Sequence, residues 1–275
     1  IRIDYKGTTN EPTTLQLYDG IYSRNGLNTN SGNPDLKPSF TNNVRIRYRN
    51  ANPEQGSFMM VFANFNHTSN DIVSISDINE KTGGRDASYA NVNGNTSGNT
   101  RFIFNRPFRN RNWSINSMSY VSYGITNTFI DKRENKAKAL NLHQNAGLRF
   151  MATEINSPWI KNVDLNLRGN IRYVNQNNSI SSNQSSRNYG GTFLFTLDFP
   201  YDWSVESDIN YSTNSGYSSG FSQKEWLWNA SIAKQVFKNK AGMIRFKIYD
   251  ILKERSNITR ESSATMTSDI ITNTI

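Results

Sequence analysis

Two carboxylates stand two residues apart on one predicted strand, which is the closest approach in the chain to an acid–base pair. Glu206 and Asp208 share one side of the alternating segment from Trp203 to Tyr211, because successive strand side chains point to opposite faces. Such a pair suits glycoside hydrolysis, but it equally suits charges that meet arginines on a polar surface. No nucleophile, base or phosphate-binding glycine loop completes the constellation. We therefore predict no catalytic residues and do not expect an enzyme.

Metal-ligating residues are equally sparse. The chain has two histidines, His67 and His143, on separate predicted strands, and no cysteine, so disulfides and thiolate metal sites are excluded. Asp71 and Asp77 share a loop, but their spacing does not match a calcium-binding helix–loop–helix. We predict no metal and no cofactor.

The strongest chemical pattern is a set of charged residues on one side of alternating segments. The side opposite the apolar residues carries Arg45, Arg47, Arg49, Arg149, Asp164, Arg168, Arg172, Glu206, Asp208, Arg245 and Lys247. In a membrane-crossing strand, a charge that faced lipid near the midplane would cost about 2–4 kcal/mol, so we predict that these residues face the lumen. Two roles stay open for them. They pair with acids of neighbouring parts of the protein, or they attract an anionic ligand.

Alternation with a period of two runs through the whole chain and predicts roughly eleven strands, many of about ten residues or more. Strands of globular proteins are more often five or six residues long. The glycine pair Gly190–Gly191 predicts a bulge or bend.

The predicted connections alternate in length, as in outer-membrane barrels, where short turns are periplasmic and long loops are outside. The short turns are expected at Asn52–Gly56, Arg106–Asn112, Asn156–Asn162, Pro200–Tyr201 and Lys238–Ala241. The longer stretches are expected at Gly7–Ser39, Ser76–Tyr89, Asp131–Lys138, Asn177–Asn188, Thr213–Ser222 and Glu254–Ile275.

Composition points to the same fold class. Hydrophobic residues make up only 35% of the chain while aromatic residues reach 12%, and the net charge is +9. A polar lumen combined with aromatic girdles gives this balance, and no apolar stretch is long enough for a transmembrane helix. Because the aromatic residues largely take the side opposite the arginines, we expect no nucleic acid partner. The prediction is an all-β fold, an antiparallel transmembrane β-barrel. A soluble lectin-like sandwich would instead bury its apolar side and have shorter strands.

One heptapeptide has a counterpart in a known family. Gly32-Asn33-Pro34-Asp35-Leu36-Lys37-Pro38 resembles a loop that precedes a barrel strand in TonB-dependent receptors, and Asn33, Pro34, Leu36 and Pro38 carry the likeness. Two prolines stiffen such a loop, and Leu36 can anchor it to the rim.

Further segments agree with this likeness in order along the chain, namely Pro12–Leu17, Ala90–Asn95, Trp228–Lys234 and Ile248–Leu252. Together they resemble the C-terminal barrel portion of the Bacteroidetes TonB-dependent receptor-like outer-membrane β-barrel proteins.

This resemblance implies that residues 1–275 are part of a larger barrel of about 22 strands, truncated at both ends and without a plug domain. It implies nutrient uptake across the outer membrane of a Gram-negative bacterium. The implied partners are outer-membrane lipid, the plug domain of the missing part of the chain, TonB acting through that plug, and a surface lipoprotein. The alternative is an outer-membrane or surface binding or adhesion β-protein without energised transport.

Overall fold

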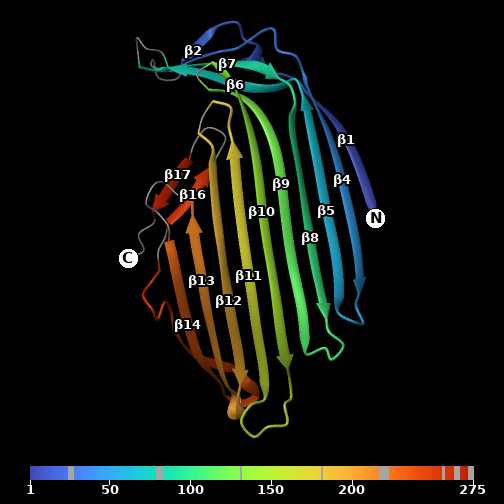
Figure 1. The fold of residues 1–275 in the computed structure, drawn as a ribbon, viewed down its shortest axis with the longest axis vertical. Coiled ribbons are helices and arrows are strands. Elements are labelled where there is room, and N and C mark those ends of the chain that lie inside the picture. Colours follow the sequence, from blue (N-terminus) through green and yellow to red (C-terminus); the bar gives the residue numbers. More distant parts are fainter. Residues whose placement is uncertain are drawn as a thin grey trace.

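Eleven strands form one antiparallel sheet, which confirms the expected number (Figure 1). The computed structural model describes all residues except 24–27, 79–82, 131, 181, 217–222, 256–257, 263–266 and 272–275. The sheet is open, with β1 and β15 at its edges, and each strand pairs with the next one of the sheet along the chain. In order, the strands are β1 (Arg2–Asn10), β4 (Ser39–Asn52), β5 (Ser57–Ser69), β8 (Asn95–Pro107), β9 (Trp113–Ile130), β10 (Arg133–Ala152), β11 (Asn162–Asn177), β12 (Gln184–Asp198), β13 (Trp203–Ser215), β14 (Gln223–Val236) and β15 (Gly242–Ile248).

The pairing register is one-to-one between every pair of neighbouring strands. Lys138–Ala152 of β10, for example, pairs with Val163–Asn177 of β11 without a skipped residue. The bulge predicted at Gly190–Gly191 is therefore wrong, because Gly190 pairs directly with Ser212. The glycine is required for a close backbone approach instead, since a Cβ at Gly190 would lie 2.3 Å from the Tyr211 carbonyl oxygen. With no bulge, each face of the sheet keeps its identity across all eleven strands.

One face of the sheet, the apolar face, presents large hydrophobic side chains that no protein layer covers. Leu167 is 56% exposed and Ile171 is 60% exposed. Other exposed members of this face are Ile3, Tyr5, Ile46, Phe65, Val121, Tyr123, Leu142, Leu148, Phe193, Trp226, Trp228, Ile232, Ile244, Phe246 and Ile248. An exposed apolar surface of this extent is stable only against lipid or another apolar partner.

A packed protein core is nearly absent from the described part of the chain. Its buried hydrophobic residues are Leu36, Val92, Ala137 and Ala233. A soluble sandwich would bury the apolar face and would use shorter strands, so the described sheet does not have that architecture. No described helix is long and apolar enough to cross a membrane.

The connections at one end of the sheet are short, as expected, and we call this the turn end. They comprise residues 53–56, 108–112, 153–161, 199–202 and 237–241. Residues 200–202 and 238–240 form 3-10 turns, η1 (Pro200–Asp202) and η2 (Lys238–Lys240).

The other end carries a second, smaller sheet, which we call the cap. The cap is built from β2 (Ile21–Ser23), β3 (Thr29–Ser31), β6 (Asp71–Ile78) and β7 (Arg85–Val92), preceded by the one-turn helix α1 (Thr14–Leu17). In Figure 1 the cap lies across the upper ends of the long strands. A two-stranded ribbon, β16 (Ile258–Ser262) with β17 (Thr267–Ile271), lies within the stretch predicted at Glu254–Ile275.

The long loop predicted at Asp131–Lys138 is wrong. β9 and β10 have 18 and 20 residues, and the chain reverses between Ile130 and Arg133, with Lys132 at a φ of 60°. The loop predicted at Asn177–Asn188 is also shorter, because β12 already begins at Gln184. Both predicted loops are too long because the ends of these strands, beyond the apolar segment, are polar and cannot be told from a polar loop by sequence. Most of the stretch predicted at Thr213–Ser222 lies outside the described residues.

We predict that Leu167→Arg destabilises the folded protein by about 2–4 kcal/mol, because it places a charge at the centre of the lipid-facing apolar face. The control is Thr196→Arg on the opposite face, where Asp164 and Glu206 are the direct cross-strand neighbours. The measurement is the free energy of unfolding in phospholipid vesicles. Equal losses for the two variants would contradict the assignment of the faces.

Candidate functional site: the polar face and the rim

The pairing register brings all eleven predicted charged residues onto one face, the polar face. Arg45 lies opposite Asn64, and this face continues through Asn99, Ser122 and Asn141 to β11 and from there to β15. The residues on it are Arg45, Arg47, Arg49, Arg149, Asp164, Arg168, Arg172, Glu206, Asp208, Arg245 and Lys247.

The firmest ion pair of this face joins Arg149 of β10 to Asp164 of β11. The Arg149 Nε donates to Asp164 Oδ1 at 2.8 Å and its Nη2 donates to Oδ2 at 2.6 Å. This two-pronged geometry fixes the planes of both groups and is the strongest form of a carboxylate–guanidinium contact. The Arg149–Asp164 pair therefore joins β10 to β11 near the turn end.

Asp4 joins the polar face as a residue that the sequence prediction missed. Its carboxylate accepts from Arg47 Nη2 at 2.7 Å and from Arg2 Nε at 2.8 Å. The alternation of Arg2-Ile3-Asp4-Tyr5 contains the signal that could have found it. Asp4 neutralises one arginine of the predicted β4 set.

Two further acids of the polar face, Glu206 and Asp208, are held as part of the wall. Glu206 Oε2 lies 3.7 Å from Arg245 Nη1. Asp208 Oδ2 accepts from Asn210 Nδ2 at 2.7 Å and from Asn229 Nδ2 at 2.8 Å. These contacts tie β13 to its neighbours and give both acids a structural use.

Several basic residues of the polar face have no acid to meet. Within the described residues Arg45, Arg49 and Arg172 have no carboxylate within ion-pair distance. Arg168 donates to the Asn166 amide oxygen at 3.0 Å, and Lys247 lies 4.7 Å from the Tyr249 ring centre. A further arginine that the sequence prediction missed, Arg101, lies over the Tyr120 ring. The polar face thus has a surplus of positive charge.

At the cap end, the motif that suggested the family likeness forms an anchored turn. The Asn33 side-chain oxygen accepts from the Asp35 amide at 2.9 Å, and its Nδ2 donates to the Tyr89 carbonyl of β7 at 3.0 Å. Pro34 lies inside this turn, and Pro38 directly precedes β4. Leu36 is buried in this region, with 7% of its surface exposed.

Three alternate asparagines, Asn91, Asn93 and Asn95, join the rim segments, and we call them the asparagine clamp. Asn91 accepts from the Lys37 amide at 2.8 Å and donates to the Lys37 carbonyl at 2.9 Å and the Asn70 carbonyl at 2.7 Å. Asn93 accepts from the Asn70 amide at 2.7 Å. Asn95 donates to Asp71 at 2.6 Å and accepts from the Asn127 amide at 2.7 Å. The clamp fixes the cap to the long strands.

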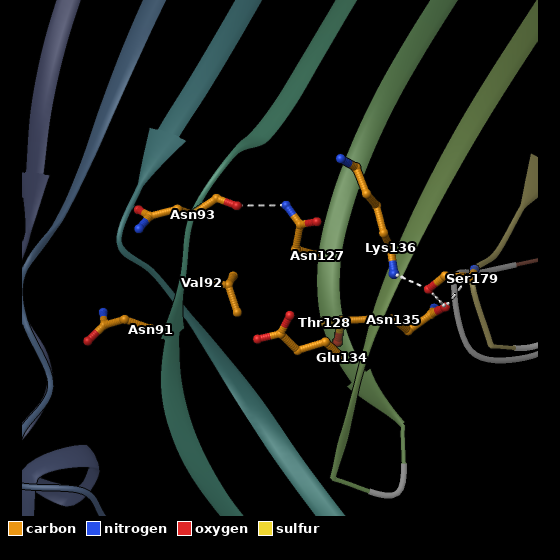
Figure 2. A pocket seen from close by; sticks show the side chains of 9 residues that line it. All are labelled: Asn91, Val92, Asn93, Asn127, Thr128, Glu134, Asn135, Lys136 and Ser179. Atoms are coloured by element: carbon orange, nitrogen blue, oxygen red, sulfur yellow. Dashed lines mark hydrogen bonds between the residues drawn. The ribbon is translucent and has the colours of Figure 1, made fainter.

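A polar pocket of about 590 Å³ lies beside the clamp (Figure 2). Its lining residues are Asn91, Val92, Asn93, Asn127, Thr128, Glu134, Asn135, Lys136 and Ser179. Asn135 is 1% exposed and accepts from the Ser179 amide and hydroxyl, while its Nδ2 has no partner among the described residues. Amide, hydroxyl, carboxylate and ammonium groups around one pocket suit a polar ligand.

The tip of the β9–β10 hairpin is tied to the cap by one ion pair. Lys132 Nζ lies 2.6 Å from Asp77 Oδ2 of β6, and this hydrogen bond lowers the pKa of the Asp77 carboxyl below its usual 3.8 and raises the pKa of Lys132. Because the folded-state pKa of Asp77 is lowered, the stabilisation is present above its unfolded pKa. It is lost as the pH falls through the folded value, below about pH 4.

Among the residues that the structure describes, no group of three or more His, Asp or Glu side chains is placed to hold a metal ion.

A comparison with protein families gives one match. A family model described as the outer membrane protein beta-barrel family matches residues 1–274. No curated protein and no solved structure matches the chain.

We predict that Asn91→Ala loosens the Lys37 end of the Asn33–Pro38 loop from β7, because the backbone of Lys37 loses both of its hydrogen bonds to the Asn91 side chain. The amide of Lys37 should exchange its hydrogen roughly tenfold faster, as expected for a hydrogen bond worth about 1–2 kcal/mol. Asn93→Ala is the matched control, since Asn93 contacts Asn70 and not Lys37. Unchanged exchange at Lys37 in Asn91→Ala would refute the clamp.

Proposed function

The chain belongs to an outer membrane protein β-barrel family and resides in the outer membrane of a Gram-negative bacterium, and on this premise we propose that it forms the wall of a TonB-dependent nutrient receptor. The cap end is the extracellular side of this receptor, because the long connections of outer-membrane barrels face outward from the cell. The polar face lines the lumen, since the apolar face has to meet lipid.

The observation that carries the proposal is the uncompensated positive charge on the polar face. Arg45, Arg49 and Arg172 extend from the wall without a carboxylate among the described residues, although Arg149 and Arg47 are firmly paired. A lumen wall with surplus cations attracts negative groups. The negative groups come from a plug domain that fills the barrel, from an anionic nutrient, or from both in turn.

The rim supports a role in binding the nutrient outside the cell before transport. The cap, the asparagine clamp and the polar pocket form one hydrogen-bonded assembly at the extracellular end, with the Asn33–Pro38 motif built into it. A glycan, a peptide and a metal chelate all carry the polar groups that this pocket can bind. The proposed role is binding and transport without a chemical step, because Glu206 and Asp208 are engaged in the wall.

The proposed partners are those of a receptor of this kind. The chain is part of a larger barrel of about 22 strands, surrounded by outer-membrane lipid and filled by a plug through which TonB acts. A surface lipoprotein is proposed to cover the extracellular side.

The test is uptake in the native bacterium, with growth measured on single oligosaccharides, peptides and iron chelates. Loss of the full-length protein and loss of TonB should abolish growth on the same nutrient. Binding of that nutrient to intact cells should survive the loss of TonB, because TonB energises transport and not capture. Uptake that continues without TonB would overturn the proposal. So would a strain lacking the full-length protein that adheres less to surfaces but takes up every nutrient normally, because this result would indicate a binding or adhesion protein.

We further predict that the combined variant Arg45→Gln, Arg49→Gln and Arg172→Gln lowers the uptake rate about tenfold, through loss of about 1.4 kcal/mol of attraction. Arg109→Gln with Arg111→Gln, in the turn after β8, is the matched control and should leave uptake unchanged. An equal effect of both variants would show that the lumen position of the charges is irrelevant.

A further inference from the structure

Basic residues also occur on the apolar face, at its extracellular border. Lys138 pairs with Ile125 and Lys136 pairs with Asn127, which places both lysines on the same face as Tyr123 and Leu140. Arg187 of β12 and Lys224 of β14 lie on this face as well, opposite Tyr173 and Thr213. We call Lys136, Lys138, Arg187 and Lys224 the basic collar.

The collar lies at and beyond the extracellular end of the membrane-embedded band. On β11 the band runs from Val163 to Tyr173, ten residue steps, which is ~33 Å along the strand and ~25 Å of height at a tilt of ~40°. This height matches the apolar band of outer-membrane barrels. Tyr173 therefore marks the extracellular border, and Arg187 is its direct neighbour across the strands.

Aromatic residues lie beside two members of the collar, Arg187 and Lys224. The Arg187 guanidinium lies 5.6 Å from the centre of the Tyr173 ring. Two residues after Lys224, the Trp226 ring packs against the Tyr211 ring at an angle of 43°, with 4.7 Å between ring centres. Tyrosine and tryptophan prefer the headgroup level of a membrane, so the charges beside them reach the headgroup layer.

The collar has no acid to neutralise it on this face. Among the described residues of the eleven strands, the apolar face carries one carboxylate, Glu134 at the tip of β10, and it makes no ion pair with the collar. The polar face differs, because Asp4, Asp164 and Glu206 are paired there with arginines. The charge on the outward face thus lacks an internal partner and has to be met from outside the barrel.

We propose that the basic collar binds the phosphate groups of the glycolipid that forms the outer leaflet of the outer membrane. Lysine and arginine are the usual protein partners of phosphate, and Lys136 and Lys138 are close enough along β10, at ~7 Å, to share one phosphate. A ligand in the lumen cannot reach Lys138, Arg187 or Lys224, because the wall lies between them, whereas Lys136 also lines the rim pocket. The inference rests on the outer-membrane location and is independent of nutrient transport.

The test uses the full-length protein in detergent micelles and titrates it with bis-phosphorylated lipid A, with the dephosphorylated form, and with phosphatidylglycerol. The collar variant is Lys136→Gln, Lys138→Gln, Arg187→Gln and Lys224→Gln. The matched control is Arg106→Gln with Lys234→Gln, two basic residues at the opposite border of the same face. Heat-modifiable migration in gels checks that each variant is folded.

The wild type should bind bis-phosphorylated lipid A about tenfold tighter than the dephosphorylated form, because each basic residue near an anionic headgroup contributes favourable binding energy. The collar variant should bind the two forms equally. The control variant should keep the difference. If the fourfold variant fails to fold, Lys136→Gln with Lys138→Gln should still weaken the binding severalfold. Wild-type affinity in the folded collar variants, or equal affinity for phosphatidylglycerol, would overturn the proposal.

Discussion

Strict alternation in an uninterrupted register is the constraint on which the rest of this structure depends. A slip of one residue in any strand would turn Leu167 and its neighbours toward the lumen and Arg168 toward lipid. The one-to-one pairing across all eleven strands prevents this, and the close approach of Gly190 to Tyr211 shows how tightly it is kept. The separation of a lipid-facing surface from a charged lumen is therefore a property of the pairing and not of any single contact.

Charge is distributed differently on the two faces, and this links the fold to its proposed uses. On the polar face, Arg149–Asp164 braces the wall, while Arg45, Arg49 and Arg172 are left for a plug or a nutrient. On the apolar face, charges are confined to the borders, where the basic collar can meet phosphates. At the rim, side-chain amides make the main connections: Asn33 and the asparagine clamp join the motif loop, the cap and β9.

The alternation and the charged side of the strands were predictable from sequence, because a period of two is local and survives without tertiary context. The length of the β9–β10 hairpin was not, since Lys136 and Lys138 are polar in a strand above the membrane just as they would be in a loop. The asparagine clamp was also missed, because asparagines are common in loops and only the fold shows which ones meet. On β5 the alternation itself is imperfect, and Phe62 lies on the polar face opposite Arg47.

The central claim is that alternate residues of each long strand face lipid and water, and a cysteine scan of β11 tests it most directly. Residues 1–275 contain no cysteine, so single cysteines at positions 163–173 can each carry a spin label in phospholipid vesicles, with any cysteine elsewhere in the full-length protein replaced by serine. Labels at odd positions should collide with oxygen dissolved in the lipid, and labels at even positions with a water-soluble nickel chelate. A uniform response along the segment, or the opposite parity, would contradict the barrel wall described here.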